Sequence, residues 1–336
     1  DVRTSGSGGV LTEGGALAAT ANVLNAGSGG LTITGGTETV LSVNGAGKIA
    51  LLGGGLTLTS GASAISGVIS GTGPLTINGG TATLSAVNTN SGAVSVQAGA
   101  LTLTGTIGGA LNVATGSALN VTGGTVTGVT TNAGSSNVTI AGGTFTGGLV
   151  NNGAGKIAAS GALVGNITNA SAASVFDVGA AGVTGNGANV FTNSGNLNVL
   201  AGNMTGLGTV ANKSGGKIAV ASGRSLLAAS VENAVGGTMT LQSGTVGGAF
   251  SNLGTLNVAG SSAITGSFVN SGTTNMANGT TGDVLTISGA ASGAGRYAMD
   301  INLTTGASDL VVGNGGVSGT VNLDFAVVPG TGGITI

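Results

Sequence analysis

The chain has 336 residues, of which 5% are charged and 72 are Gly, and its net charge at pH 7 is −2. Because its seven Lys and Arg residues are scattered, these values exclude a basic nucleic-acid-binding surface and a strong attraction to anionic membranes. The sequence has no His and no Cys, and the absence of Cys fits a protein that avoids oxidative cross-linking in the periplasm or outside the cell. No run of about 20 apolar residues predicts a transmembrane helix.

A short theme recurs along the chain: an apolar residue, Asn or Ser, a small residue, Gly, and then a short apolar segment. The repeats are about 20 residues apart, and the side chain six positions after each Asn is apolar, as at Val96, Ile218 and Met239. This near-constant period is typical of a stacked solenoid. The aligned polar positions are Asn25, Asn44, Ser70, Asn90, Asn112, Asn132, Asn151, Asn169, Asn193, Asn212, Asn233, Asn252 and Asn270.

Short alternating segments lie between these positions, and the abundant Gly, Thr, Val, Ser and Asn disfavour helix. In chain order, we expect strands at 31–33, 56–59, 75–77, 94–96, 101–103, 197–199 and 256–258. A coil of about 20 residues has room for three such strands and three corners formed by Gly and Asn. We therefore predict an all-β fold, a single-stranded parallel β-helix (solenoid) with about 20 residues per coil.

The Asn positions predict a column of stacked side chains at one corner, because Asn tolerates the left-handed backbone region and can bond its neighbours in adjacent coils. The position two residues before the Asn becomes large and apolar in the second half, as at Phe191, Phe250 and Phe268. Because these coils bury more apolar area, we expect the C-terminal half to be the more stable one.

The composition changes near residue 282. Four acids, Asp283, Asp300, Asp309 and Asp324, and the one Tyr, Tyr297, lie beyond this point. Because terminal units of solenoids are commonly atypical, we predict a β-helix repeat array at 1–282 and a distinct C-terminal cap at 283–336.

Two stretches resemble the passenger domain of autotransporters, the type V secreted proteins of Gram-negative bacteria. The segment GTGPLTINGG at 71–80, with the apolar and Gly positions that follow it up to Leu101, resembles the repeat associated with passenger transport. The more specific match comprises GDVLTI at 282–287, GRYAMDINL at 295–303 and SDLVV at 308–312. It resembles the autochaperone-like segment in which passengers end.

The resemblance implies a right-handed β-helix that is exported through an outer-membrane barrel, with the C-terminal cap folding first. It implies a secreted or cell-surface location in a Gram-negative bacterium. The 336 residues include no linker helix, barrel strands, or protease or lipase domain, in which they depart from the family pattern. We therefore expect either a passenger that has been released from its barrel or a protein that lacks the translocator. Since the start does not look like a signal peptide, we expect a mature form from which any signal has been removed.

Catalysis on glycans needs clustered carboxylates. The first 282 residues contain only Asp1, Glu13, Glu38, Asp177 and Glu232, and no two of them share a repeat position on neighbouring coils. We therefore predict no catalytic, cofactor-binding or metal-binding residues, no cofactor and no enzymatic activity.

For the other charged residues we favour structural roles. We expect Asp300 and Asp309 to cap turns or accept backbone hydrogen bonds rather than to bind Ca²⁺. Lys48, Lys156 and Lys217, each followed by Ile, are expected at one corner of the coil as solvated edge charges, with a weak anionic-ligand site as the alternative.

The function that these features favour is a non-enzymatic, extracellular structural or adhesive rod that binds a host or cell-surface glycan or protein through shape and multivalency. The alternative is a filament subunit that self-associates end to end, because both ends of a β-helix expose unpaired strand edges and the segment 330–336 reads as another strand. A glycan-active enzyme is the third and weakest alternative.

Overall fold

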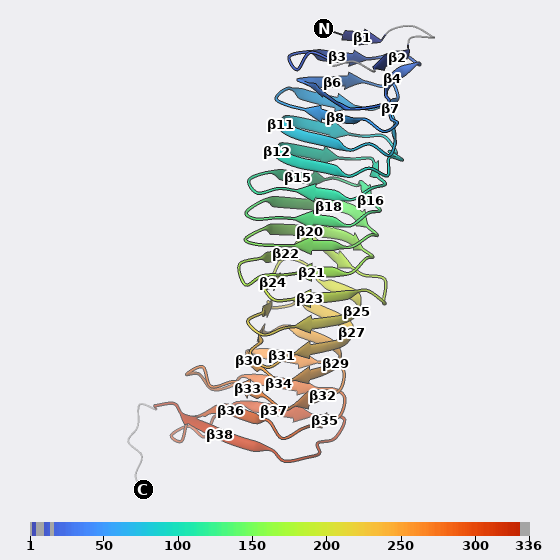
Figure 1. Cartoon of the computed structure of the whole chain (residues 1–336). Helices are drawn as coiled ribbons and strands as arrows, with labels where there is room; N and C mark the ends of the chain where they lie inside the picture. The colour runs from blue at the N-terminus through green and yellow to red at the C-terminus, as the bar shows by residue number, and fades with distance from the viewer. Residues whose placement is uncertain (1, 5–9, 14–16, 330–336) are drawn as a thin grey trace. The chain divides into compact units, whose positions relative to one another are not determined.

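The computed structural model describes residues 2–4, 10–13 and 17–329, with side chains from residue 17 onward. These residues form strands joined by turns, with no helix among them. The chain divides into two compact units, unit 1 (Asp1–Asn166) and unit 2 (Ile167–Ile336). Each unit is a parallel β-solenoid built from stacked coils of about 19 residues, as Figure 1 shows for the strands of each unit. The predicted fold class is confirmed.

Each coil of unit 1 passes through three faces, called the first, second and third face in chain order. The first face contains β5 (Thr37–Val40), β8 (Gly55–Leu58), the starts of β11 (Leu75–Leu84) and β12 (Val94–Leu103), β14 (Leu111–Val113), β17 (Thr130–Asn132) and β19 (Leu149–Asn151). The second face contains β1 (Val2–Thr4), β3 (Asn22–Asn25), β6 (Ser42–Gly45), β9 (Ala62–Ile65), the ends of β11 and β12, β15 (Ala118–Val121), and the starts of β18 (Asn137–Phe145) and β20 (Lys156–Leu163). The third face contains β2 (Val10–Glu13), β4 (Gly30–Ile33), β7 (Ile49–Leu51), β10 (Ile69–Gly71), β13 (Thr106–Ile107), β16 (Thr125–Val126) and the ends of β18 and β20.

Unit 2 has the same three-face plan. Its first face contains β21 (Ile167–Asn169), β23 (Val190–Asn193), the ends of β25 (Met204–Asn212), β27 (Ser225–Asn233) and β29 (Thr245–Asn252), then β32 (Phe268–Asn270) and β35 (Ala291–Ser292). Its second face contains the start of β22 (Val175–Thr184), β24 (Asn196–Val199), β26 (Lys217–Val220), β28 (Thr238–Gln242), β30 (Thr255–Ala259), β33 (Thr273–Asn275), β36 (Arg296–Ile301) and β38 (Asn322–Val327). Its third face contains the end of β22, the starts of β25, β27 and β29, then β31 (Ser261–Ile264), β34 (Val284–Ile287) and β37 (Leu310–Gly313).

Alternate residues of each strand point into a narrow apolar interior, because side chains on a strand have a period of two. On the first face of unit 1, Leu56, Leu75, Val94 and Leu111 are in register from coil to coil and are all buried. Burial of such aliphatic rows is the main favourable contribution to the stability of a solenoid that has so few charges.

The corresponding row of unit 2 contains the aromatic side chains that the sequence predicted there. Phe191, Val210, Val231, Phe250 and Phe268 pair in register, and all five are buried. The rings of Phe250 and Phe268, in adjacent coils, have centroids 5.3 Å apart. The predicted repeat position of these residues is confirmed.

Gly is required where the backbones of adjacent coils approach closely at a corner. Gly248 has φ of +92°, in the left-handed region, and a Cβ there would overlap the carbonyl oxygen of Ala228 one coil away. A side chain at this corner would force the two coils apart, which explains part of the high Gly content.

The predicted Asn column is correct from Asn132 onward within each unit and wrong before it. Asn112 pairs with Ser95 and Thr131 and faces solvent, while its neighbour Val113 pairs with Asn132. A one-residue shift of register moves a side chain to the opposite face of a strand, so the alignment of Asn112 by spacing alone placed it on the wrong side.

The earlier Asn positions also leave the column. Asn25 and Asn44 lie on the second face, where Asn44 pairs with Leu24 rather than with Asn25. Ser70 lies on the third face, and Asn90 lies outside the named strands. In unit 1 the row that later carries Asn132 is filled by aliphatic residues, Val40, Leu58, Ile77, Val96 and Val113.

The residues six positions after each Asn do not form a single row. Ile218 and Met239 pair with each other, but Val199 pairs with Val220, which lies two residues after Ile218. The shift arises because the corner after Asn193 is shorter than the corner after Asn212. Val199 is still buried because the shift is an even number of residues, whereas Val175 pairs with Asn196 and is only partly buried.

The boundary predicted at residue 282 stays a prediction. The strands beyond it continue the faces of unit 2, since Ile264 of β31 pairs with Ile287 of β34, and Ile287 pairs with Gly313 of β37.

Candidate functional site

In each unit, buried Asn side chains stack from coil to coil at the last position of the first-face strands, and we call this row the asparagine ladder. In unit 2 the Nδ2 atom of each Asn donates to the Oδ1 atom of the Asn one coil later, over 2.9, 2.8, 2.8, 2.8 and 2.9 Å. The members are Asn169, Asn193, Asn212, Asn233, Asn252 and Asn270, and the side chains are fully buried. The bonds link residues 18 to 24 apart in sequence, so the ladder tolerates coils of unequal length. The predicted column of Asn193, Asn212, Asn233, Asn252 and Asn270 is confirmed.

The second amide hydrogen of each ladder residue is bonded to a backbone carbonyl at the next corner. Asn233 donates to the oxygen of Thr255 over 2.9 Å, and Asn252 donates to the oxygen of Thr273 over 3.1 Å. In unit 1, Asn132 and Asn151 form the same kind of pair, over 2.9 Å. Because burial without partners would be costly, these bonds make the ladder a structural element that aligns the corners, not a reactive site.

Three buried carboxylates, Asp283, Asp300 and Asp309, accept hydrogen bonds at the corner that precedes the third face in the last coils of unit 2. Asp283 accepts from the backbone N–H of Gly260 over 2.7 Å and from the Nδ2 atom of Asn278 over 2.6 Å. Asp309 in turn accepts from the backbone N–H groups of Asp283, over 3.0 Å, and Asp300, over 2.8 Å. These bonds connect three successive coils at one corner.

Asp300 binds the loop between β33 and β34. Its Oδ2 atom accepts from the backbone N–H groups of Asn278, Gly279 and Thr280 over 2.8, 2.7 and 3.1 Å. The expectation that Asp300 and Asp309 accept backbone hydrogen bonds is confirmed. Among residues 17–329, no group of three or more His, Cys, Asp or Glu side chains is arranged to hold a metal ion.

Burial and neighbouring charge shift two ionisable groups of this region. Burial raises the pKa of Asp309, the charges of Asp283 and Asp300 raise it further, and the backbone N–H donors oppose the shift. Burial likewise raises the pKa of Tyr297, against a hydrogen bond with the side chain of Asn270, the last member of the ladder.

The carboxylates considered for catalysis lie apart. Glu38 is buried and accepts from the backbone N–H of Leu17 over 2.6 Å, and Asp177 accepts from Asn198 over 2.8 Å. Glu232 is partly exposed and lies 3.9 Å from Lys213. In register these three pair with Leu56, with Asn198, and with Ala211 and Ser251 respectively, so none stacks on another acid. Asp1 and the side chain of Glu13 lie outside the described residues.

The three Lys–Ile pairs do not occupy one corner. Lys156 and Lys217 each begin a strand of the second face, whereas Lys48 precedes β7 on the third face. The expected common corner is therefore wrong for Lys48, for the same reason of register as Asn44. All three Lys side chains are exposed, which agrees with solvated edge charges.

Shallow grooves that are lined by both polar and apolar side chains lie on the first face in both units. In unit 2 a groove of about 330 Å³ is lined by Thr209, Ser230, Ser251, Ser267 and Glu232, among others. The hydroxyls of Thr209 and Ser230 lie 3.0 Å apart. In unit 1 a groove of about 260 Å³ is lined by side chains that include Gln97, Asn112 and Thr131. Hydroxyl and amide groups of this kind can bind a ligand that has many hydroxyls of its own.

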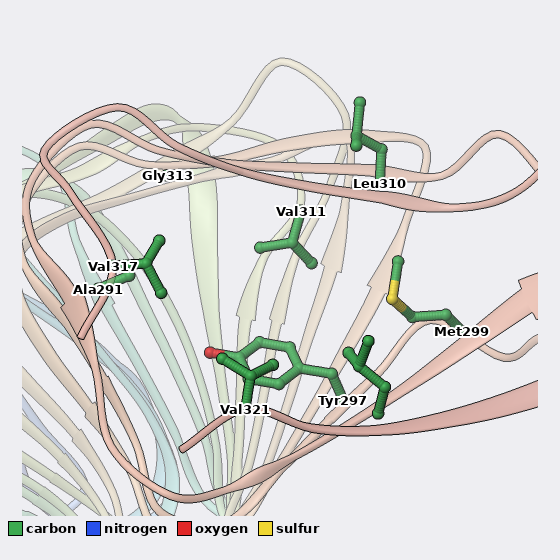
Figure 2. A pocket seen from close by; sticks show the side chains of 9 residues that line it. Ala291, Tyr297, Met299, Leu310, Val311, Gly313, Val317 and Val321 are labelled. Atoms are coloured by element: carbon green, nitrogen blue, oxygen red, sulfur yellow. The ribbon is translucent and has the colours of Figure 1, made fainter. Parts of the chain in front are cut away.

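An apolar cavity of about 260 Å³ lies at the last described coil of unit 2. Its lining residues are Ala291, Tyr297, Met299, Leu310, Val311, Gly313, Val317, Val321 and Leu323. Figure 2 shows the ring of Tyr297 beside Val311, Val317 and Val321 in this cavity. The sequence signal that could have located it is the alternation of Leu323, Phe325 and Val327, which matches an inward-facing row.

The comparisons with known proteins add no family to this geometry. No protein-family model matches the sequence, and no curated protein matches it. In the part of the chain that the structure describes, there is no helix that could cross a bilayer.

Proposed function

We propose that this chain is a non-enzymatic, extracellular structural or adhesive protein that presents regular polar rows to a surface partner. The observation that supports this most is the stacking of hydroxyl side chains on the outside of the coils. Thr39, Thr57, Thr76 and Ser95 follow one another in register on the first face of unit 1, and all are partly exposed. Since adjacent coils are about 4.8 Å apart, such a row offers many identical weak contacts at a fixed spacing.

Multivalent contact is the mechanism that suits this surface. A single hydroxyl contributes little, but several that engage one extended partner raise the overall affinity without a deep pocket. The partner class that fits is a glycan or a protein on a host or bacterial cell surface, because hydroxyl and amide rows match hydroxyl-rich or backbone hydrogen-bonding groups.

The test is binding of the purified chain to arrays of cell-surface glycans and matrix proteins. A variant with Thr57, Thr76 and Ser95 changed to Lys should lose binding while keeping the thermal midpoint of the parent chain. A variant with Thr106, Thr125 and Thr144 changed to Lys alters a row on the third face and is the matched control. Equal binding by all three proteins would refute a role for the first face.

We propose export by an autotransporter-like route, for which the resemblance of 71–80 and 282–312 is the support. The test is fusion of the chain between an export signal and an outer-membrane translocator in a Gram-negative host. Surface display of a protease-resistant chain is the expected result. Periplasmic retention of the folded chain, with a known passenger displayed in parallel, would contradict it.

A filament subunit is the second candidate, and the apolar cavity at the last described coil of unit 2 favours it. Electron microscopy of the purified chain distinguishes the two, because a filament has many copies in line and an adhesive chain does not. A third, enzymatic function predicts turnover of acidic polysaccharides, which activity screening would detect.

A further inference from the structure

The last described coil of unit 2 ends in an apolar surface that its own strands leave uncovered. We define this end face by Val311, Val317, Val321, Leu323, Phe325 and Val327. The last five are 62%, 47%, 53%, 52% and 54% exposed. Phe325 differs from Phe145, Phe176, Phe191, Phe250 and Phe268, all of which are buried.

The end face continues rows that are buried one coil earlier. Leu323 pairs with Tyr297 and Phe325 pairs with Met299, and both of these partners are only 8% exposed. Val317 pairs with Ala291, which is 4% exposed. The exposure therefore arises because the rows of the solenoid interior reach the surface at this coil, around the cavity shown in Figure 2.

Charge does not oppose contact between two such surfaces. Asp324 is the only charged residue between Leu310 and Val327. Its carboxylate forms an ion pair with Arg296 of β36, one coil earlier. Two copies of the end face would thus meet with paired rather than like charges, and mutual repulsion would be small.

We propose that the end face binds the end face of a second copy of this chain, forming a two-fold symmetric dimer. An isologous contact needs only one self-complementary patch, and this patch is apolar, nearly uncharged and partly concave. A two-fold axis perpendicular to the sheet that contains β38 makes the two copies of β38 antiparallel, so that their free edges can also exchange backbone hydrogen bonds. This contact is independent of the adhesive role proposed above. It competes with the filament, because both would use the apolar end of unit 2 and a two-fold contact closes on itself.

The exposed area is close to what such a dimer needs. Five side chains that are about half exposed give on the order of 400–500 Å² of apolar surface, large for a patch on a monomer. Two copies together bury on the order of 800–1,000 Å², at the lower limit for a specific interface. We therefore expect a reversible dimer with a dissociation constant of micromolar order.

The first test is sedimentation equilibrium of the full chain, compared with Phe325→Lys and with Val235→Lys as the matched control. Val235 is 71% exposed on unit 2 outside the end face, so its variant also replaces an exposed side chain with a charge. The proposal predicts a dimer for the parent and the control, and at least about thirty-fold weaker association for Phe325→Lys. A strictly monomeric parent, or a dimer that Phe325→Lys does not weaken, would overturn it.

The second test separates the second copy from other occupants of the end face. Phe325→Lys and Phe325→Glu should each be monomeric, and an equimolar mixture should form a heterodimer, because each variant brings one charge to the symmetric contact. If the parent is monomeric and deletion of residues 330–336 makes it dimerise, the chain's own last residues occupy the face and the proposal is wrong. Circular dichroism melting of every variant checks that the fold is retained.

Discussion

The substitution Asn233→Ala tests most directly how much the asparagine ladder stabilises the fold. The Asn233 side chain accepts from Asn212 over 2.8 Å, donates to Asn252 over 2.8 Å, and donates to the oxygen of Thr255 over 2.9 Å. Alanine removes all three bonds and leaves buried polar atoms on both sides without their partner. At about 1–3 kcal/mol for each unsatisfied group, with some relaxation, the loss of unfolding free energy should be about 3–5 kcal/mol.

The measurement is urea unfolding followed by circular dichroism, with Asn112→Ala as the control. Spacing alone groups Asn112 with the ladder, but in the structure its side chain faces solvent. Its substitution should therefore change stability by no more than about 0.5 kcal/mol. Equal losses for the two variants would refute the register described for the first face. A double variant at Asn212 and Asn233 should cost less than the sum of the single losses, because the two residues share a bond.

Three further predictions follow from the same structure. Met239→Asp should lower the unfolding free energy by several kcal/mol, because Met239 is fully buried and the new carboxylate would have no partner, and an unchanged urea midpoint would contradict this. The pKa of Asp309 is raised above its ordinary value of 3.8, so the folded chain holds this proton more tightly and stability should fall as pH rises from 3.8 through the raised pKa. Asp309→Asn should flatten that part of the pH profile, because the titrating group is gone. It should also lower the melting temperature at pH 3.8 and below, because the Nδ2 group of Asn cannot accept from the backbone N–H of Asp300, and a profile parallel to that of the parent would count against the assignment. Limited proteolysis should degrade residues 1–130 before the Phe-containing coils of unit 2 and the segment after 282, and the reverse order would contradict polarised stability.

The sequence was sufficient to predict the class of fold and the regular part of the ladder. A period near 20 residues, alternating apolar segments and abundant Gly are local signals, and all three report directly on a stacked coil. Asn193, Asn212, Asn233, Asn252 and Asn270 were correctly aligned because the strand before each of them ends at the same place in the coil.

Register in the first coils could not be read from spacing. A corner that gains or loses one residue moves the next side chain to the opposite face, as at Asn112, while a change of two residues keeps it inside, as at Val199. The backbone bonds of Asp300 and Asp309 could be predicted in kind, but most of their donors, such as Gly279 and Gly282, lie one coil away, and their positions depend on coil stacking. The end face was missed because exposure of an inward-facing row depends on whether another coil covers it.

The predicted stacking of residues one coil apart can be measured directly with engineered disulfides, since the sequence contains no Cys. Ala219 and Thr240 pair in register on the second face of unit 2, and Thr240 pairs with Asn257 in the following coil. Cysteines at 219 and 240 should lie about 5 Å apart and oxidise to a disulfide, whereas cysteines at 219 and 257, about 10 Å apart, should stay reduced. Rapid oxidation of the first pair alone is the result that the solenoid predicts. Failure of that pair to oxidise, or equal oxidation of both pairs, would contradict the stacked-coil register on which the ladder, the polar rows and the end face depend.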